Sequence, residues 1–488
     1  MQLPQINVVD VQTLQGRIQG AHQVTSARIQ PTLGVRALHR LCCERYVGPT
    51  IEFLNEQAEH FLANAFGVTV GGVDQRAANI QEGSQLIARF KLVRLAAPRH
   101  GAEADASHPE PGSAERSLLH SRTLLVKGPR KRVWPYGGAM KLGVNLGYWG
   151  AGNDADNLEV AREADRLGYA VAWAAEAYGS DAATVLSWIA AQTTTIDVGS
   201  AIFQIPGRTP ANCAMTAATL DTLSGGRFRL GLGVSGPQVS EGWHGVRFDK
   251  PLARTREYVD IVRMALRRER VSYDGDFWQL PLPNGPGKSL RLTVHPVRES
   301  LPIYLAAIGP KNLKLCGEIA DGWLAIFFSP EDAAGLMEPI VAGRATVDKT
   351  MEGFDVVPTV PVVPGTDVEA CAELVRPYAA LYVGGMGSRD KNFYNQLMSR
   401  MGYEQAAIDV QDRYMNKDYA GAAAAVPFEF LDKTSLLGPP ERIGERLHAY
   451  AEAGVTTLSI SSFAGTIDER VGTLRMMSKA LEASGLAD

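Results

Sequence analysis

Apolar and polar positions along the chain separate strand-length segments from helix-length segments. The clearest example is residues 200–236. There the apolar run 201–205 is followed by helix-spaced apolar residues within 209–223, and then by the apolar run 228–234. A strand that is apolar on both faces must be covered on both, which is typical of parallel sheets. The segment therefore predicts two parallel strands joined by a helix.

The ends of this helix are marked by residues with known capping roles. Thr209 offers an N-cap hydroxyl, and Pro210 stands at the first helical position, where its missing N–H costs no hydrogen bond. Gly225 and Gly226 follow the last apolar position and predict the end of the helix.

Comparable apolar runs recur from residue 140 to the last residues, and helical patterns separate most of them. The runs that we interpret as strands are 141–147, 170–176, 196–203, 228–234, 303–308, 320–327, 354–363 and 455–461. This alternation predicts an α/β fold, a (β/α)8 TIM barrel with insertions, and a doubly wound sheet is the alternative. We expect the insertion 271–300 to form a hairpin and the insertion 381–436 to be largely helical.

Residues 1–139 differ from the barrel segment 140–488. They are rich in Pro, Arg and Ser toward their end, and only residues 51–65 have the pattern of an amphipathic helix. Too little periodic apolar sequence is present to offset the entropy of ordering the chain. We expect a poorly structured N-terminal extension or translation from a misplaced start, and a small accessory domain is the alternative.

Composition narrows the class of protein. The chain has 488 residues, of which 45% are hydrophobic and 21% charged, and its formal net charge is −4. This charge argues against nucleic-acid binding, and no apolar run is long enough to span a membrane. Five cysteines without metal-type spacing favour reduced thiols in a cytoplasmic protein and predict no metal site.

The loop after the fourth predicted strand has the spacing of a dinucleotide fingerprint. Gly231, Gly233 and Gly236 match G-x-G-x-x-G. Such a fingerprint opens a helix after the first strand of its fold, whereas we expect residues 237–243 to form a loop after the fourth strand. We therefore expect these small residues to let a flat ring or a phosphate approach the backbone.

Two further strand ends carry candidate chemistry. The fifth strand ends in small residues, and a helix starts after it at Pro310. The free N–H groups at the start of this helix, together with Lys311, suit an anion. A tight turn that serves only packing is the alternative. Glu176 follows the second strand, at the end of a barrel where catalytic residues lie. Asp181 is the better N-cap of the next helix, which would leave Glu176 available for function; a cap or salt bridge is the alternative.

One histidine is a candidate acid or base. His244 follows Trp243 in the loop after the fourth strand, and imidazole titrates near neutral pH. A structural or pocket-lining role is the alternative. The chain contains neither a G-x-S-x-G elbow nor a His-x-x-x-His pair, so a hydrolase or a metal enzyme has little support.

Three segments together resemble the bacterial luciferase-like superfamily, and within it the coenzyme F420-dependent oxidoreductases. The segments are 168–182, 199–236 and 303–324, and the resemblance runs from Met140 to the last residues. It implies that a flavin-like ring lies at the carboxyl end of the barrel, against a non-proline cis peptide bond near 201–202. The residues that it implies for cofactor binding are Glu176, Ala201, Ile202, Val234, Ser235, Gly236, Ala306, Ala307, Ile308, Gly309, Pro310 and Lys311.

The chain departs from one branch of this superfamily. Its sugar-phosphate dehydrogenases have a histidine directly after the acid of strand 2 and a catalytic glutamate in the strand-4 loop, where this chain has Ala177 and Gly236–Pro237. Another substrate is therefore expected. Glu176 and His244 remain the catalytic candidates, and the residues expected to line the substrate pocket are Trp149, Tyr178, Trp243 and His244.

The leading hypothesis is an enzyme that moves hydride between coenzyme F420 and a small organic substrate. Within the same fold, the alternatives are an FMN-dependent monooxygenase that uses reduced flavin and O2, and a flavin-binding barrel without catalysis. A non-redox lyase would need a metal or a Schiff-base lysine that the sequence does not indicate. The resemblance also implies a homodimer.

Overall fold

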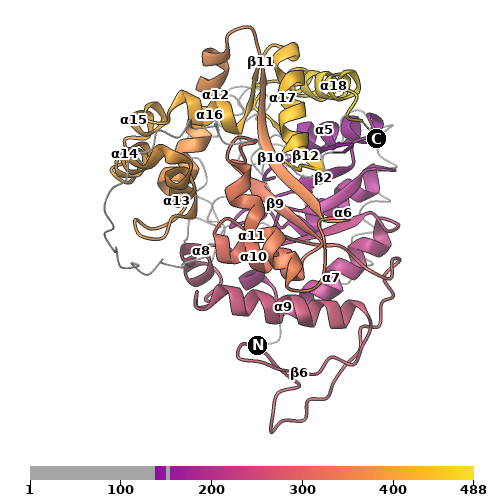
Figure 1. Cartoon of the computed structure of the whole chain (residues 1–488). Coiled ribbons are helices and arrows are strands. Elements are labelled where there is room, and N and C mark those ends of the chain that lie inside the picture. The colour runs from indigo at the N-terminus through magenta and orange to yellow at the C-terminus, as the bar shows by residue number, and fades with distance from the viewer. Residues whose placement is uncertain (1–137, 150–153, 488) are drawn as a thin grey trace, which may run out of the picture. The chain divides into compact units, whose positions relative to one another are not determined.

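The computed structural model describes residues 138–149 and 154–487. The expectations for the N-terminal extension, including the helix over 51–65, lie outside these residues. Within them, eight parallel strands close into a barrel, and helices surround it (Figure 1).

The strand pairing shows the closure directly. β1 (Lys141–Asn145) pairs with β2 (Val171–Ala174) on one side and with β12 (Thr457–Ser462) on the other. Between them the barrel continues through β3 (Asp197–Ser200), β5 (Phe228–Gly233), β8 (Ile303–Ala306), β9 (Gly322–Ile326) and β10 (Asp355–Pro364), and β10 pairs with β12. Every one of the eight overlaps a predicted strand. The TIM barrel is confirmed, and the doubly wound alternative is wrong.

Helices follow the strands and begin at the expected caps. The Asp181 carboxylate accepts a hydrogen bond from the Thr184 amide at 2.8 Å, and the Thr209 hydroxyl accepts one from the Asn212 amide at 3.2 Å. The helices around the barrel are α5 (Asp154–Arg166), α6 (Ala182–Gln192), α7 (Pro210–Leu223), α9 (Pro251–Leu266), α10 (Pro310–Ile319), α11 (Ala333–Ala345), α12 (Val368–Ala380), α17 (Pro440–Glu452) and α18 (Ile467–Ser484). None of the helices described here combines the length and apolar character needed to cross a bilayer.

Side chains fill the interior of the barrel. Trp173 on β2 packs edge-on against Tyr304 on β8, with ring centroids 5.3 Å apart. Nearer the amino ends of the strands, the Arg229 guanidinium pairs with Asp197 at 2.7 Å and with Asp355 at 3.1 Å. The charges of this cluster can stay inside the barrel because they are paired. Together with the aromatic rings they fill the interior, as side chains do in other TIM barrels.

Both insertions have the predicted character. Residues 271–300 contain the antiparallel hairpin of β6 (Tyr273–Asp274) and β7 (Gln279–Leu280), which extends away from the barrel (Figure 1). Residues 381–436 contain the short helices α13 (Phe393–Met398), α14 (Glu404–Met415), α15 (Tyr419–Ala424) and α16 (Phe428–Thr434). Strand β11 (Leu436–Gly438) then adds to the edge of β10.

The loop expected over 237–243 is wrong. Residues Pro237–Gly242 form the short helix α8, with Gly236 as its N-cap in extended conformation. Pro237 stands at the first helical position, where its fixed φ favours a helix start. The glycine fingerprint therefore does open a helix, although one of six residues that follows the fourth strand of the barrel.

Candidate active site

The predicted site residues all lie at one rim of the barrel. Because the strands are parallel, their carboxyl ends meet at this rim. Trp149 follows β1, Glu176 follows β2 and the segment 201–202 follows β3. The loop 234–236 follows β5, and the turn 307–311 follows β8.

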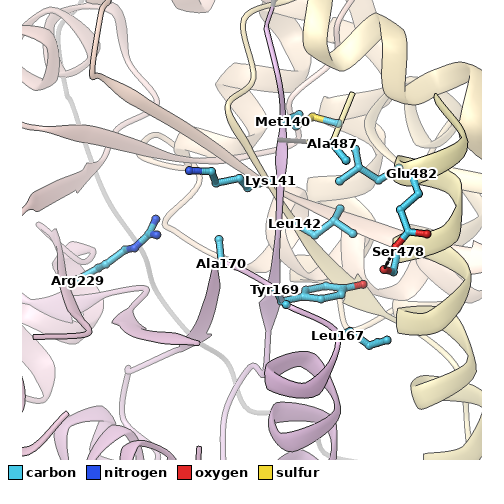
Figure 2. Close-up of a pocket in the computed structure, with 12 residues that line it drawn as sticks. Met140, Lys141, Leu142, Leu167, Tyr169, Ala170, Arg229, Ser478, Glu482 and Ala487 are labelled. Carbon is cyan, nitrogen blue, oxygen red and sulfur yellow. Dashed lines mark hydrogen bonds between the residues drawn. The ribbon is translucent and has the colours of Figure 1, made fainter. Parts of the chain in front are cut away.

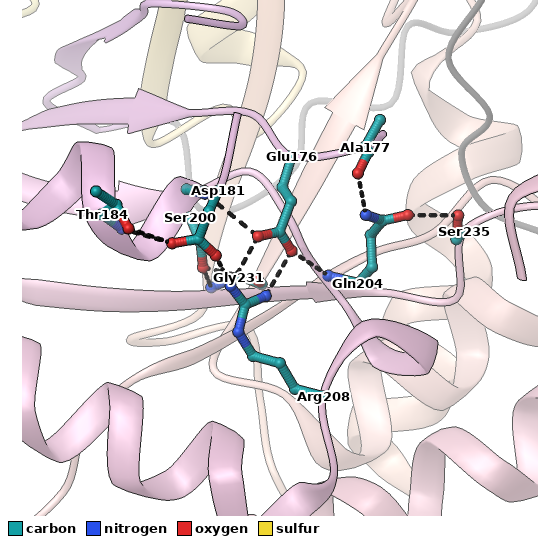
Figure 3. A network of polar contacts seen from close by, with 10 residues as sticks. Glu176, Ala177, Asp181, Thr184, Ser200, Gln204, Arg208, Gly231 and Ser235 are labelled. Carbon is teal, nitrogen blue, oxygen red and sulfur yellow. Dashed lines mark hydrogen bonds and ion pairs between the residues drawn. The ribbon is translucent and has the colours of Figure 1, made fainter. Parts of the chain in front are cut away.

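Both carboxylate oxygens of Glu176 accept hydrogen bonds from neighbouring segments of this rim. Its two carboxylate oxygens accept hydrogen bonds from the Arg208 guanidinium at 2.5 and 2.8 Å (Figure 3). They also accept bonds from the backbone amides of Ala182 and Gln204, each at 3.2 Å. The salt bridge that the sequence left open as an alternative for Glu176 is present, with Arg208 as the partner. Asp181 caps α6, but Glu176 still anchors the same turn.

Arg208 links the loops that follow strands 2 and 3. It pairs with Asp181 as well as with Glu176, and its side chain is only 11% exposed. Burial lowers the pKa of Arg208, but Glu176 and Asp181 outweigh this effect and raise the pKa above its ordinary value. The guanidinium also lies over the ring of Phe203, 4.3 Å from its centroid. This corner of the rim is a satisfied ion-pair network.

Gln204 extends the network to the loop after strand 4. Its side-chain amide nitrogen donates to the Ala177 carbonyl at 2.8 Å, and its side-chain oxygen accepts from the Ser235 hydroxyl at 2.9 Å (Figure 3). Ser235 is fully buried, and its φ of 61° is left-handed. Three rim loops are thus joined through one side chain.

The small residues of the rim do two different things. The peptide bond between Ala201 and Ile202 is cis, as the resemblance implied. Both residues belong to one apolar cluster with Ala306, above Trp173 in the barrel. A Cβ atom on Gly231, by contrast, would stand 1.9 Å from the Ser200 carbonyl oxygen. Strand packing therefore explains why residue 231 is a glycine, so the expected close approach of a ring or phosphate stays a prediction for the later part of the loop, 234–236.

The turn after strand 5 has a buried first part, Ala307 to Gly309, and two exposed residues, Pro310 and Lys311. Gly309 is the N-cap of α10 and brings no side chain to the helix start, while Lys311 is exposed. The first amides of a helix have no carbonyl partner within it, so they can bind an anion. The Ile308 carbonyl accepts a hydrogen bond from Arg400 Nη2 at 3.2 Å. A cation from the insertion 381–436 thus contacts this turn.

The four residues expected to line a substrate pocket lie near one another. The Trp149 amide donates to the Ser180 hydroxyl at 3.0 Å, and the rings of Tyr178 and Trp243 lie 6.4 Å apart. The buried Trp149 Nε1 and His244 Nε2 atoms have no hydrogen-bond partner in the described part of the chain.

His244 is half-buried close to the Glu176 ion pair. Burial lowers its pKa below the ordinary value of 6.5, Glu176 raises it and Arg208 lowers it, with a net decrease. The imidazole is therefore neutral at pH 7, and in that form one ring nitrogen can accept a proton.

A family model described as luciferase-like monooxygenase matches residues 140–457. The chain belongs to the luciferase-like monooxygenase family. The family drawn from the sequence is confirmed. A Mycobacterium tuberculosis relative with the provisional name coenzyme F420-dependent oxidoreductase is 42% identical over 330 residues, which is 66% of this chain and 95% of that protein. The 5,10-methylenetetrahydromethanopterin reductase of Archaeoglobus fulgidus is 30% identical over 61% of this chain and 87% of its own length. The chain is accordingly an oxidoreductase.

Solved structures agree with the family in fold. The coenzyme F420-dependent tetrahydromethanopterin reductase of Methanopyrus kandleri has a TM-score of 0.59 at 22% identity, over 70% of this chain and 98% of that one. The oxygenating constituent of 3,6-diketocamphane monooxygenase from Pseudomonas putida, in complex with FMN, has a TM-score of 0.52 at 19% identity, over 70% and 98%. At these identities the luciferase-like fold is what the chain shares with them.

Sequence reasoning missed three side chains of this luciferase-like rim. Arg208 stands between Pro206 and Pro210 directly after a strand, and this position could have indicated it as the partner of Glu176. Gln204 is the polar residue in the apolar run of strand 3, another usable signal. Arg400 had no such signal, because its contact at Ile308 lies 92 residues away.

A separate cavity lies at the opposite end of the barrel. It measures about 400 Å³ and is lined by Lys141, Ala170 and Arg229 at the starts of strands, and by Ser478 and Glu482 on α18 (Figure 2). Function in TIM barrels resides at the carboxyl rim, while the opposite end serves stability. We therefore assign the chemistry to the rim rather than to this cavity.

Proposed function

We propose that this protein transfers hydride between coenzyme F420 and a small organic substrate at the carboxyl rim. The observation that carries the proposal is the apolar cluster that includes Ala201, Ile202 and Ala306, at the same rim as the loop 234–236 with its Ser235 hydroxyl and the turn 307–311 with its helix start. A ring with apolar faces and polar edges suits such a surface. The 42% identity to a protein named for F420 supports this choice of cofactor.

The residues of the rim fit the parts of a deazaflavin coenzyme. When bound, the coenzyme supplies or accepts the hydride. Ala201, Ile202 and Ala306 would pack against the ring, and the backbone of 234–236 would meet its edge. The turn 306–311, from Ala306 and Ala307 to Lys311, would hold the phosphate through amides at the start of α10.

Glu176 has a positioning role in this proposal. Its carboxylate already accepts bonds from Arg208 and from two backbone amides, so a substrate proton would have to displace one of them. By fixing the loops after strands 2 and 3, Glu176 would hold Ala201 and Ile202 in position relative to the other loops of the rim.

His244 is our candidate for proton transfer. Neutral imidazole at pH 7, with a buried Nε2 that lacks a partner among the described residues, can accept the proton of a substrate hydroxyl during oxidation. In the reverse direction the protonated ring returns it. Trp149, Tyr178 and Trp243 would form the apolar walls around the substrate.

Titration of the purified protein with coenzyme F420 and, separately, with FMN tests the cofactor. We expect saturable quenching of deazaflavin fluorescence and weaker binding of FMN. Tight FMN binding without F420 binding would overturn the assignment and favour the monooxygenase. Binding of F420 without substrate-dependent change in its absorbance, across a panel of alcohols, aldehydes and enones, would favour a barrel without catalysis.

We also propose a homodimer. Trp188 on α6 and Met215 on α7 are each 54% exposed, and the two helices pack side by side. Exposed apolar side chains on adjacent helices are typical of a subunit interface. Light scattering should give the mass of two chains, and a monomeric mass at micromolar concentration would contradict this.

A further inference from the structure

Arg400 differs from Arg208 at the rim and from Arg229 inside the barrel. Arg208 and Arg229 each pair with two carboxylates. Among the described residues, Arg400 forms no ion pair, and its hydrogen bond is to the Ile308 carbonyl. Burial lowers the pKa of Arg400 from its ordinary value, and nothing described here compensates with negative charge. The residue as a whole is exposed, and its guanidinium lacks a counter-charge among the described residues.

The position of Arg400 in the fold indicates which ligand could supply the missing counter-charge. Arg400 belongs to the segment Ser399–Tyr403, within the insertion between strands 7 and 8. Its contact reaches across 92 residues to the loop after strand 5. One N–H group bonds to Ile308, while a guanidinium has five N–H donors in a planar fork. The remaining donors are what planar recognition of a phosphate or carboxylate requires.

A role confined to packing explains this contact less well. A neutral amide could make the same bond to the Ile308 carbonyl, but only a guanidinium keeps further N–H donors that carry positive charge. Arginines elsewhere in the insertion that do serve structure have acidic partners, such as Arg413 with Asp418 at 3.1 Å. Outside the insertion, Arg227 and Arg344 also bond to backbone carbonyls without an ion pair among the described residues, so what distinguishes Arg400 is its place beside the start of α10.

We propose that Arg400 determines specificity for the anionic side chain of the cofactor, by binding its phosphate beside the 306–311 turn. The inference rests on the proposed function and adds the residue that separates a phosphate-bearing deazaflavin from the bare core. The insertion 381–436 thereby contributes a residue to the cofactor site. Lys311 and Arg400 are both exposed, but Arg400 is fixed on the Ile308 carbonyl and offers a planar fork of donors, whereas a lysine is a flexible point charge.

The test compares two probes on three proteins. The probes are coenzyme F420 and the riboflavin-level deazaflavin core, which lacks the phosphate and everything beyond it. The proteins are the wild type, Arg400→Gln and the control Arg413→Gln, which removes the same charge from the same insertion. Dissociation constants come from fluorescence titration at low and high salt, and thermal unfolding midpoints show whether each variant is folded.

We expect Arg400→Gln to weaken F420 binding by about 10- to 100-fold, as for loss of a charge-assisted hydrogen bond, and to leave binding of the core unchanged. The salt dependence of F420 binding should also become shallower, and Arg400→Lys should restore part of the affinity. Arg413→Gln should match the wild type with both probes.

Four results would overturn the inference. Equal weakening of both probes would make Arg400 a structural residue, and unchanged F420 affinity in Arg400→Gln would remove it from the site. If the wild type binds neither probe, the proposed function itself fails, and the inference falls with it. If the wild type binds the core but gains nothing from the phosphate, the function stands and only the role of Arg400 is refuted.

Discussion

The two halves of the carboxyl rim differ in how their charges are satisfied. On the side of strands 2 to 4, Glu176, Asp181 and Arg208 neutralise one another, and Gln204 joins their loops. On the side of strand 5, Arg400 contacts a carbonyl and forms no ion pair with any described residue. In one half of the rim the described charges are paired within the protein, whereas in the other half Arg400 keeps N–H donors for an anionic ligand.

The largest effect should come from breaking the satisfied half. Arg208→Met leaves the Glu176 carboxylate buried without its cation, so we expect unfolding free energy to fall by about 3–5 kcal/mol. Urea denaturation measures this. The double variant Glu176→Gln/Arg208→Met should recover part of the loss, because no unpaired carboxylate remains. A loss below about 1 kcal/mol for Arg208→Met would mean that the pair is as weak as an exposed one.

Removal of the candidate proton acceptor should affect rate more than structure. We expect His244→Gln to lower turnover by about 100-fold or more while the protein still binds F420. The pKa of His244 lies below 6.5, so wild-type activity should fall only on acidification through that lower pKa. A variant with wild-type turnover would exclude His244 from the chemistry.

The same histidine predicts a pH dependence of stability. Burial depresses its folded-state pKa below the unfolded value of 6.5, so the unfolded chain binds the proton more readily. Wild-type stability should therefore decline, relative to His244→Gln, as the pH falls from 6.5 toward the folded-state pKa. Parallel denaturation curves of the two proteins at each pH check this, and a constant difference across that range would contradict it.

Loss of the link between loops should have a smaller effect. Gln204→Leu removes the bonds to Ala177 and Ser235, and we expect a cost of about 1–3 kcal/mol in unfolding free energy. F420 affinity should fall as well, because the loops after strands 2 and 4 lose their common anchor. Unchanged affinity with reduced stability would separate the network from the cofactor site.

The smallest effect should come from the exposed lysine of the unsatisfied half. We expect Lys311→Gln to weaken F420 binding by about 2- to 3-fold at low salt, and the difference should vanish at high salt. Titration at both ionic strengths measures it. An effect larger than that of Arg400→Gln would reverse the roles given to these two cations.

The sequence predicted the barrel well because its signals are local. Apolar runs, the caps at Asp181 and Thr209, and glycine helix stops all act within a few residues, and the structure reproduces them. The prediction of a loop over 237–243 was wrong because a proline can stand at the first position of a short helix as readily as in a loop.

The site was harder to predict because its contacts are long-range. The ion pair of Glu176 with Arg208 joins two loops through residues 32 positions apart. Residue 231 is a glycine because a Cβ atom there would clash with the Ser200 carbonyl oxygen, 31 positions away. Charge balance at such points depends on which loops meet at the rim. A local pattern gives the residue type at each loop but not its partner.

A crystal structure of the protein with coenzyme F420 tests the central claim most directly. We predict the ring against Ala201, Ile202 and Ala306 at the carboxyl rim, with its phosphate between the start of α10 and Arg400. Density for the coenzyme in the cavity beside Lys141 and Arg229, at the opposite end of the barrel, would contradict the account.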